Sequence, residues 1–236
     1  GMAKEGAVPV LFENSTFLQR AFDQLSHDVA ANDLPVVMMV AGGGMSGTSK
    51  THLGIFDQVM ISNLPNWIYL APTTLAEEND MMELAIMQRK HAVAIKVPTK
   101  RVPAGKDVSR DYSEIKYDIK PGNDVAVLAL GDMYEMLGKE VAEKLGASLV
   151  NPISANILDT ASLDKLADEN KVIVTLEDNI LDGGFGEKVA SYLGDKDVKV
   201  LNYGQKRVYT DQVPLKDILK DNRMTVDQIV EDVKNA

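Results

Sequence analysis

Two side chains near the N-terminus, Phe17 and Arg20, place an aromatic ring and a guanidinium group at the beginning of a predicted helix. Ser15 or Thr16 can cap this helix directly after a strand. A core-facing stripe recurs at helical spacing and consists of Leu18, Ala21, Phe22, Leu25 and Val29. At roughly 100° per residue, Phe17 and Arg20 lie about a quarter-turn away from this stripe. Spacing alone therefore predicts that Phe17 is a hydrophobic staple or a domain-contact residue.

A histidine, His52, follows a glycine-rich turn. An imidazole can hold or move a proton near neutral pH, but a lone histidine is usually structural. The turn itself, Gly42-x-Gly44-x-x-Gly47, satisfies a dinucleotide-binding fingerprint after a strand. No helix starts cleanly at Gly47, and no acidic residue closes a second strand about twenty residues later. Nicotinamide-dinucleotide binding therefore stays open only as an alternative.

Four segments carry a resemblance to a known family. Residues 15–24 read Ser-Thr-Phe-Leu-Gln-Arg-Ala-Phe-Asp-Gln, and residues 51–57 read Thr-His-Leu-Gly-Ile-Phe-Asp. Residues 176–179 read Leu-Glu-Asp-Asn, and residues 183–186 read Gly-Gly-Phe-Gly. The first two resemble the pyrimidine-binding domain, and the last two the C-terminal domain, of the 1-deoxy-D-xylulose 5-phosphate synthase family of transketolase-like enzymes. The resemblance covers essentially the whole chain.

This resemblance implies a thiamine-diphosphate enzyme and assigns roles to four residues. Phe17 would stack on the pyrimidine of the cofactor, since an aromatic face can hold a flat heterocycle, and Arg20 would lie close by. His52 would face the reacting carbon and act as the catalytic residue. Lys96 would contact substrate. The reaction would join a two-carbon unit from pyruvate to glyceraldehyde 3-phosphate with loss of carbon dioxide, a step of isoprenoid biosynthesis.

The resemblance also implies that parts of the enzyme lie outside this chain. The family's Gly-Asp-Gly motif, which holds magnesium and the diphosphate, is absent, and the cofactor-activating glutamate would fall roughly ten residues before Gly1. We expect a piece of a longer polypeptide or a natural half-enzyme, with an N-terminal diphosphate-binding domain or subunit as partner, in a homodimer. A split transketolase and a non-catalytic scaffold or regulator remain alternatives, because an arginine and a tyrosine of the family's acceptor site are replaced.

The elements that must position these residues alternate between strand and helix, which predicts two consecutive three-layer α/β domains with mostly parallel sheets. The predicted strands are 8–12, 35–40, 67–70, 93–97, 125–130, 148–150, 172–176 and 198–201. Residues 98–122 carry prolines and glycines in a mixed charge run and read as a mobile linker. We place the domains at 1–117 and 118–236 and expect first proteolytic cleavage between Ala104 and Arg110. In the second domain, Glu177 and residues 183–186 are interpreted as structural, away from the cofactor.

Composition narrows the classes of partner. The 236 residues carry a formal net charge of -10, which argues against nucleic acid because phosphate-backbone binding needs a basic stripe. No apolar run approaches the roughly 18 residues that cross a bilayer, so no membrane partner is expected and the chain is read as cytoplasmic. With no cysteine and three histidines, little material exists for a metal site in this chain.

Overall fold

The first sheet belongs to the N-terminal half of the chain. The computed structural model describes residues 1–99, 102–106, 112 and 114–236. Strands β1 (Val10–Asn14), β2 (Val37–Ala41), β3 (Trp67–Leu70) and β4 (Ala92–Lys96) pair in the order β1-β2-β4-β3, and every pair is parallel. Apart from β1 and from Lys96 at the end of β4, these strands are continuous apolar runs, as is typical of strands covered on both faces.

Helices cover both faces of this sheet. The first helical segment consists of a 3-10 turn (Ser15–Phe17), α1 (Leu18–Asp23) and a π turn (Gln24–Val29), and it shares a face with α2 (Asp57–Ser62). The opposite face is covered by α3 (Leu75–Gln88), which packs against Val37, Val93 and Ile95. The three layers agree with the fold class expected from the sequence.

Two local expectations for the first helix are wrong. The residue that caps it is Asn14, whose side-chain oxygen accepts a hydrogen bond from the backbone N–H of Thr16 at 3.1 Å. The hydroxyl of Ser15 is directed to Asp57 instead. Phe22, expected in the core-facing stripe, is 38% exposed, whereas Leu18 and Leu25 are buried. Because α1 packs against α2, the buried stripe of the helix contains fewer residues than the sequence pattern predicts.

The second sheet follows in the C-terminal half. Strands β5 (Asp118–Lys120), β6 (Val125–Ala129), β7 (Ser148–Asn151), β8 (Val172–Ile180) and β9 (Lys199–Gln205) pair in the order β5-β7-β6-β8-β9. The β5–β7 pair is antiparallel, and the other pairs are parallel.

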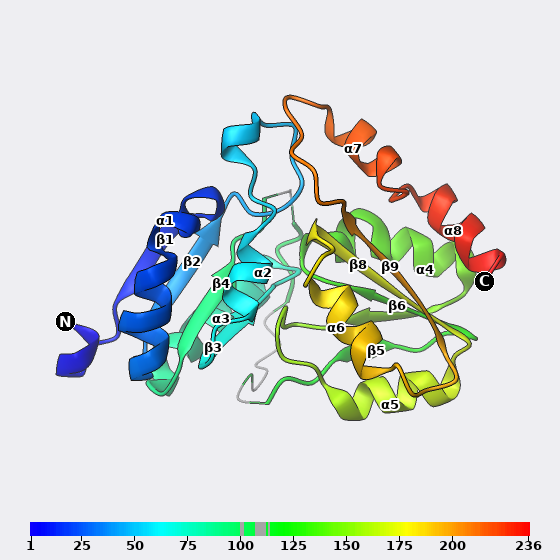
Figure 1. Cartoon of the computed structure of the whole chain (residues 1–236). Helices are drawn as coiled ribbons and strands as arrows, with labels where there is room; N and C mark the ends of the chain where they lie inside the picture. The colour runs from blue at the N-terminus through cyan, green and yellow to red at the C-terminus, as the bar shows by residue number, and fades with distance from the viewer. Residues whose placement is uncertain (100–101, 107–111, 113) are drawn as a thin grey trace.

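Helices again form two outer layers (Figure 1). Helices α5 (Thr160–Glu169) and α6 (Phe185–Tyr192) lie on one face, and a π turn (Tyr134–Gly138) with α4 (Lys139–Leu145) and α8 (Val226–Lys234) lies on the other. Alternation along β6 explains the arrangement, since Leu128 packs toward α5 while Val127 packs toward α4. Helix α7 (Leu215–Asp221) precedes α8 along the edge of the molecule.

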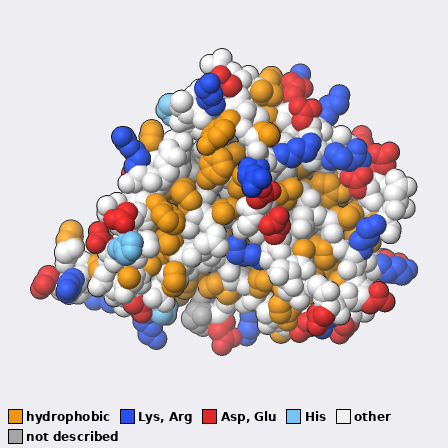
Figure 2. All heavy atoms as spheres, in the orientation of Figure 1, with side chains coloured by type: hydrophobic (Ala, Val, Ile, Leu, Met, Phe, Trp, Pro, Cys, Tyr) orange, Lys and Arg blue, Asp and Glu red, His pale blue; other side chains and the backbone are white. Residues whose placement is uncertain are grey.

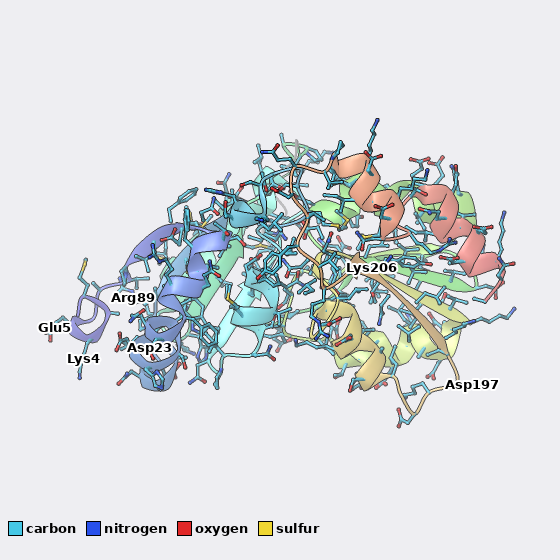
Figure 3. All side chains as sticks on the ribbon, turned by 45° about the horizontal axis from the view of Figure 1, so that its top comes forward. Lys4, Glu5, Asp23, Arg89, Asp197 and Lys206 are labelled. Atoms are coloured by element: carbon cyan, nitrogen blue, oxygen red, sulfur yellow. The ribbon has the colours of Figure 1, made fainter. Side chains whose placement is uncertain are left out.

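The segment between the sheets is attached to its surroundings where the structure describes it. The carbonyls of Pro103 and Ala104 accept hydrogen bonds from the first backbone N–H groups of α3, and Tyr117 is buried. Residues 107–110 of the expected cleavage region lie outside the described residues, so the mobile linker and the boundary at 117/118 stay predictions. At the other end of the first domain, a turn at Ala3–Glu5 projects from the body of the molecule (Figure 3).

No helix among the residues that the structure describes has the length and apolarity needed to span a membrane.

Candidate functional site

Phe17 and His52, which come from separate segments, lie together at the surface. Phe17 ends the 3-10 turn before α1 and is 44% exposed. His52 ends a second 3-10 turn, Lys50–His52, that follows β2. The two ring centroids are 6.0 Å apart with an interplanar angle of 77°, an edge-to-face contact. The Thr16 hydroxyl donates a hydrogen bond to the Thr51 carbonyl at 3.3 Å, which ties the two turns together.

The imidazole of His52 is held through one nitrogen. Its Nδ1 lies 3.0 Å from the Thr51 hydroxyl and 3.3 Å from the Ser49 hydroxyl. The side chain is exposed, and Nε2 has no hydrogen bond to any residue in the described part of the chain. A ring anchored at Nδ1 can present Nε2 to a ligand as donor or acceptor, depending on the tautomer.

Arg20 lies beside Phe17 in the same hollow. An open cavity of about 380 Å³ is lined by Glu13, Phe17, Arg20, Ala21 and Gln24. Its volume is within the range of small-molecule pockets, roughly 300–1,000 Å³. An exposed aromatic ring and a guanidinium in a hollow of this size can hold a flat heterocycle.

A second cavity, of about 400 Å³, opens between the two domains and was missed from the sequence. It is lined by Ser15, Thr16, Gln19, Lys50, Thr51, Leu53, Phe56, Met60 and Tyr209. Phe56 and Tyr209, which both line it, are in ring contact with centroids 5.8 Å apart. Hydrophobic side chains gather on the face where the domains meet (Figure 2). Tyr209 lies in the segment after β9, which ends at Gln205; Lys206, at the start of this segment, is labelled in Figure 3. No local pattern predicts that this loop reaches the first domain.

The structure separates Lys96 from the other three predicted site residues. Lys96 ends β4, is only 4% exposed and lines neither of the two cavities above. Its Nζ donates a hydrogen bond to Asp178 Oδ1 of the second domain at 2.5 Å. Burial opposes the charged form, but the carboxylates of Asp178 and Asp57 outweigh it and raise the pKa of Lys96. The predicted contact of Lys96 with substrate stays a prediction.

A buried carboxylate network surrounds this ion pair. Asp57 accepts hydrogen bonds from the Ser15 hydroxyl at 2.8 Å, from Asn179 Nδ2 at 3.0 Å and from the Tyr69 hydroxyl. Burial, and then the nearby Asp57 carboxylate, raise the pKa of Tyr69, so this phenol stays a donor. Burial also raises the pKa of Asp178, because one lysine cannot neutralise several carboxylates.

The glycines of the glycine-rich turn are required because the turn packs closely against Asp178 and against neighbouring backbone. A Cβ on Gly44, whose φ is +98°, would lie 2.0 Å from Asp178 Oδ2, and a Cβ on Gly54 would lie 2.0 Å from the Gly42 carbonyl. Gly44 and Gly54 also form an antiparallel bridge. After β2 the next α-helix begins only at Asp57, so the turn presents no α-helix N-terminus to a pyrophosphate, which argues against the dinucleotide alternative.

Glu177 has a structural environment. Its carboxylate accepts hydrogen bonds from the backbone N–H groups of Phe185 and Gly186 at the start of α6, at 3.0 and 2.9 Å, and from Gln58 Nε2 at 3.1 Å. Burial raises the pKa of Glu177 to about 8, against the opposing effect of the Gly186 and Phe185 N–H groups. The regular pairing of β8 with β9 is interrupted between Leu176 and Ile180, where Glu177 reaches the first domain.

Among the described residues, no group of three or more histidine, aspartate or glutamate side chains is arranged to hold a metal ion.

Comparison with known proteins identifies both halves. Residues 1–104 match the family described as "Transketolase, pyrimidine binding domain", and residues 113–229 match "Transketolase, C-terminal domain". Similar curated proteins are 1-deoxy-D-xylulose-5-phosphate synthases. The one from Clostridium tetani is 32% identical over 99% of this chain and 39% of its own length. The one from Clostridium acetobutylicum is 35% identical over 87% of this chain and 35% of its own length. The one from Pseudoalteromonas translucida is 37% identical over 86% of this chain and 34% of its own length.

A solved structure described as "Split gene transketolase, inactive beta4 tetramer" has the same fold, with a TM-score of 0.87 at 24% identity, covering 99% of this chain and 78% of that one. The chain spans between about a third and two-fifths of the length of the curated relatives it matches. Two transketolase domains, matched in order along nearly the whole chain, together with these relatives place the chain in the thiamine-diphosphate-dependent, transketolase-like family that includes the 1-deoxy-D-xylulose-5-phosphate synthases.

Proposed function

We propose that this chain is the C-terminal part of a two-carbon transferase that makes 1-deoxy-D-xylulose 5-phosphate and carbon dioxide from pyruvate and glyceraldehyde 3-phosphate. The observation that carries the proposal is the exposed Phe17 ring in edge contact with His52 on the pyrimidine-binding domain. When bound, thiamine diphosphate supplies the electron sink that lets a carbon–carbon bond beside a carbonyl be broken and formed.

In this proposal, Phe17 and Arg20 bind the cofactor and orient it. Phe17 is 44% exposed at the hollow that Arg20 also lines, so the ring can cover a flat heterocycle without first leaving a packed core. Aromatic stacking adds about 0.5–1.5 kcal/mol beyond the area it buries. The guanidinium of Arg20 can hold an anionic group of the cofactor or substrate.

His52 is the residue proposed to move a proton. With Nδ1 beside the Thr51 and Ser49 hydroxyls, Nε2 is left to steer the carboxylate of the donor or to transfer a proton at the reacting carbon. A positioned general acid or base of this kind contributes typically 10²–10⁴-fold to turnover. His52 therefore acts mainly on kcat, and Phe17 mainly on cofactor affinity.

In this proposal, the groups that hold magnesium and the diphosphate come from a partner polypeptide. We propose that magnesium and the diphosphate are held by an N-terminal diphosphate-binding domain or subunit, that the assembly is a cytoplasmic homodimer, and that this chain alone is inactive and binds the cofactor weakly. The relatives' greater length and the fold shared with a split gene transketolase support a partner polypeptide.

The surroundings of Lys96 favour a second candidate. Its ammonium is paired with Asp178 and buried, so the side chain at position 96 is not a planar arginine fork for a phosphorylated acceptor. This single observation fits the second candidate, a split transketolase subunit with another acceptor or a scaffold, better than it fits a site for glyceraldehyde 3-phosphate. Steady-state kinetics of the assembled enzyme with phosphorylated and unphosphorylated aldehydes separates these candidates.

The test compares three variants in the assembled enzyme. Phe17→Ala should weaken thiamine diphosphate binding in calorimetry, while His52→Ala should lower kcat with little change in cofactor affinity. Phe22→Ala is the matched control, because Phe22 is also a partly exposed phenylalanine on the same helix but does not line the hollow. Unchanged cofactor affinity in Phe17→Ala, or an equal loss in Phe22→Ala, would contradict the proposal.

A further inference from the structure

Asp57 joins separate segments of the protein at one buried carboxylate. It is the first residue of α2 and is fully buried. Its Oδ1 accepts hydrogen bonds from the Ser15 hydroxyl at 2.8 Å and from Asn179 Nδ2 of the second domain at 3.0 Å. Its Oδ2 accepts one from the Tyr69 hydroxyl. Helix α2 lies between the first sheet and the second domain (Figure 1), so Asp57 connects the second domain to the turn that begins at Ser15.

Both partners of the Phe17–His52 contact are attached to this carboxylate. Ser15 and Phe17 are the two ends of one 3-10 turn, and Ser15 is buried whereas Phe17 is 44% exposed. His52 and Asp57 belong to the same segment, between β2 and β3. An exposed ring that no packed core surrounds takes its position from the backbone that carries it, since close packing is what locks a side chain. The Ser15–Asp57 hydrogen bond therefore sets where Phe17 lies relative to His52.

Asn179 belongs to an interruption of β8 that reaches the first domain. The register with β9 is broken between Leu176 and Ile180. Each of the three residues in that interval forms a side-chain hydrogen bond with the first domain, and the pairs are Glu177–Gln58, Asp178–Lys96 and Asn179–Asp57. The Asn179 pair leads on to Ser15 through Asp57. The Gln58 and Glu177 side chains have no hydrogen bond to Ser15 or Asp57 in the described part of the chain. Neighbouring contacts across one interface therefore differ in what they can move.

We propose that Asn179 is a positioning residue of the candidate site, which acts through Asp57 and Ser15 to hold Phe17 against His52. Without the Asn179 amide, Asp57 would be a buried carboxylate with one donor fewer. Because an unsatisfied buried acceptor is costly, the carboxylate would turn toward another donor or admit water, and either change would move Ser15. The second domain thus takes part in forming the site. The consequence for cofactor binding rests on the proposed function, whereas the Phe17–His52 contact does not.

The first measurement uses the chain by itself and follows the Phe17–His52 contact by NMR. The ring centroids are 6.0 Å apart, so the ring current of Phe17 displaces the carbon-bound proton resonances of the imidazole. Phe17→Ala defines the positions of these resonances without that ring, and His52→Gln assigns them. Spectra are taken well above the usual histidine pKa of about 6.5, so that protonation does not contribute. The other two histidines, His27 and His91, are internal references.

Asn179→Ala should move the His52 resonances more than half of the way to their positions in Phe17→Ala. Ser15→Ala interrupts the same connection at its other end and should move them in the same direction, and the double variant should add little. Gln58→Ala is the matched control, because Gln58 is also buried and donates a hydrogen bond across the same interface, to Glu177 at 3.1 Å. It should leave the His52 resonances unmoved.

Unfolding followed by Trp67 fluorescence establishes which variants are folded, and Ser15→Ala decides the test if Asn179→Ala does not fold. Unmoved His52 resonances in the folded variant would overturn the proposal. An equal displacement in Gln58→Ala would also overturn it, because the interface would then act as a whole.

Thiamine diphosphate affinity is measured separately, in the assembled enzyme. Asn179→Ala should lower it at least about threefold, as expected for the loss of one hydrogen bond, with a smaller change in kcat at saturating cofactor. If the His52 resonances move while the affinity stays the same, the proposed role of Phe17 in cofactor binding fails and the positioning by Asn179 stands.

Discussion

Replacing Lys96 by methionine should strongly destabilise the protein. Lys96 and Asp178 are each 4% exposed, and Asp57 and Asp132 lie close enough to act on the charge of the lysine. Methionine fills a similar volume, so the substitution removes the charge while leaving little cavity. Several carboxylates would then remain buried without their cation. Removing one partner of a buried ion pair costs about 3–5 kcal/mol, because the charge left behind is not compensated.

Asp178→Asn should cost less than Lys96→Met. In that variant Lys96 keeps the nearby carboxylates of Asp57 and Asp132, and the asparagine can still accept a hydrogen bond from the ammonium. The expected loss is about 1–3 kcal/mol. The double variant should lose less than the sum of the two, because both changes remove the same interaction.

Urea unfolding at pH 7 measures these free energies. The single tryptophan, Trp67, is 3% exposed in the first domain and reports its unfolding by fluorescence. Lys171→Met is the control, because its pair with Asp124 is 3.5 Å long and both side chains are mostly exposed; its unfolding midpoint should not move measurably. A loss below about 1 kcal/mol in Lys96→Met, or a larger loss in Asp178→Asn, would refute the argument that one lysine neutralises several buried acids.

Three further predictions concern other parts of the chain. The pKa of Glu177 is raised from 4.5 to about 8 in the folded protein, so the folded state keeps a proton that the unfolded state loses. Stability should therefore fall by up to about 5 kcal/mol as pH rises from 4.5 to 8, and thermal unfolding of Glu177→Gln should show a flatter pH profile. Gly44→Ala should destabilise the protein by about 2–4 kcal/mol in urea, because its Cβ would lie 2.0 Å from Asp178 Oδ2 at a φ of +98°; an unchanged midpoint would be inconsistent with this packing. Calorimetry with magnesium should detect at most weak thiamine diphosphate binding to the chain alone, and submicromolar affinity would mean that the chain holds a complete site.

Sequence determined the layered α/β architecture and the position of Phe17 outside the core-facing stripe. Buried parallel strands must be continuous apolar runs, such as Val37–Ala41 and Val125–Ala129, and such runs are visible without any contact map. Phe17 could be placed outside the core-facing stripe from the sequence because the angle between side chains of a helix depends only on their spacing along the chain. The structure confirms the consequence, since Phe17 is exposed and Leu18 is buried.

Tertiary structure alone decided which groups face one another. Lys96 and Asp178 are 82 positions apart, and Gln58 and Glu177 are 119 apart; no periodicity encodes such a pairing. The same reason accounts for Tyr209 in the interdomain cavity, and for Phe22, whose exposure depends on what α1 packs against. Hydrophobic patterning specifies which face of an element is buried. The partner that buries it, and the charge that a buried lysine meets, depend on contacts between distant segments.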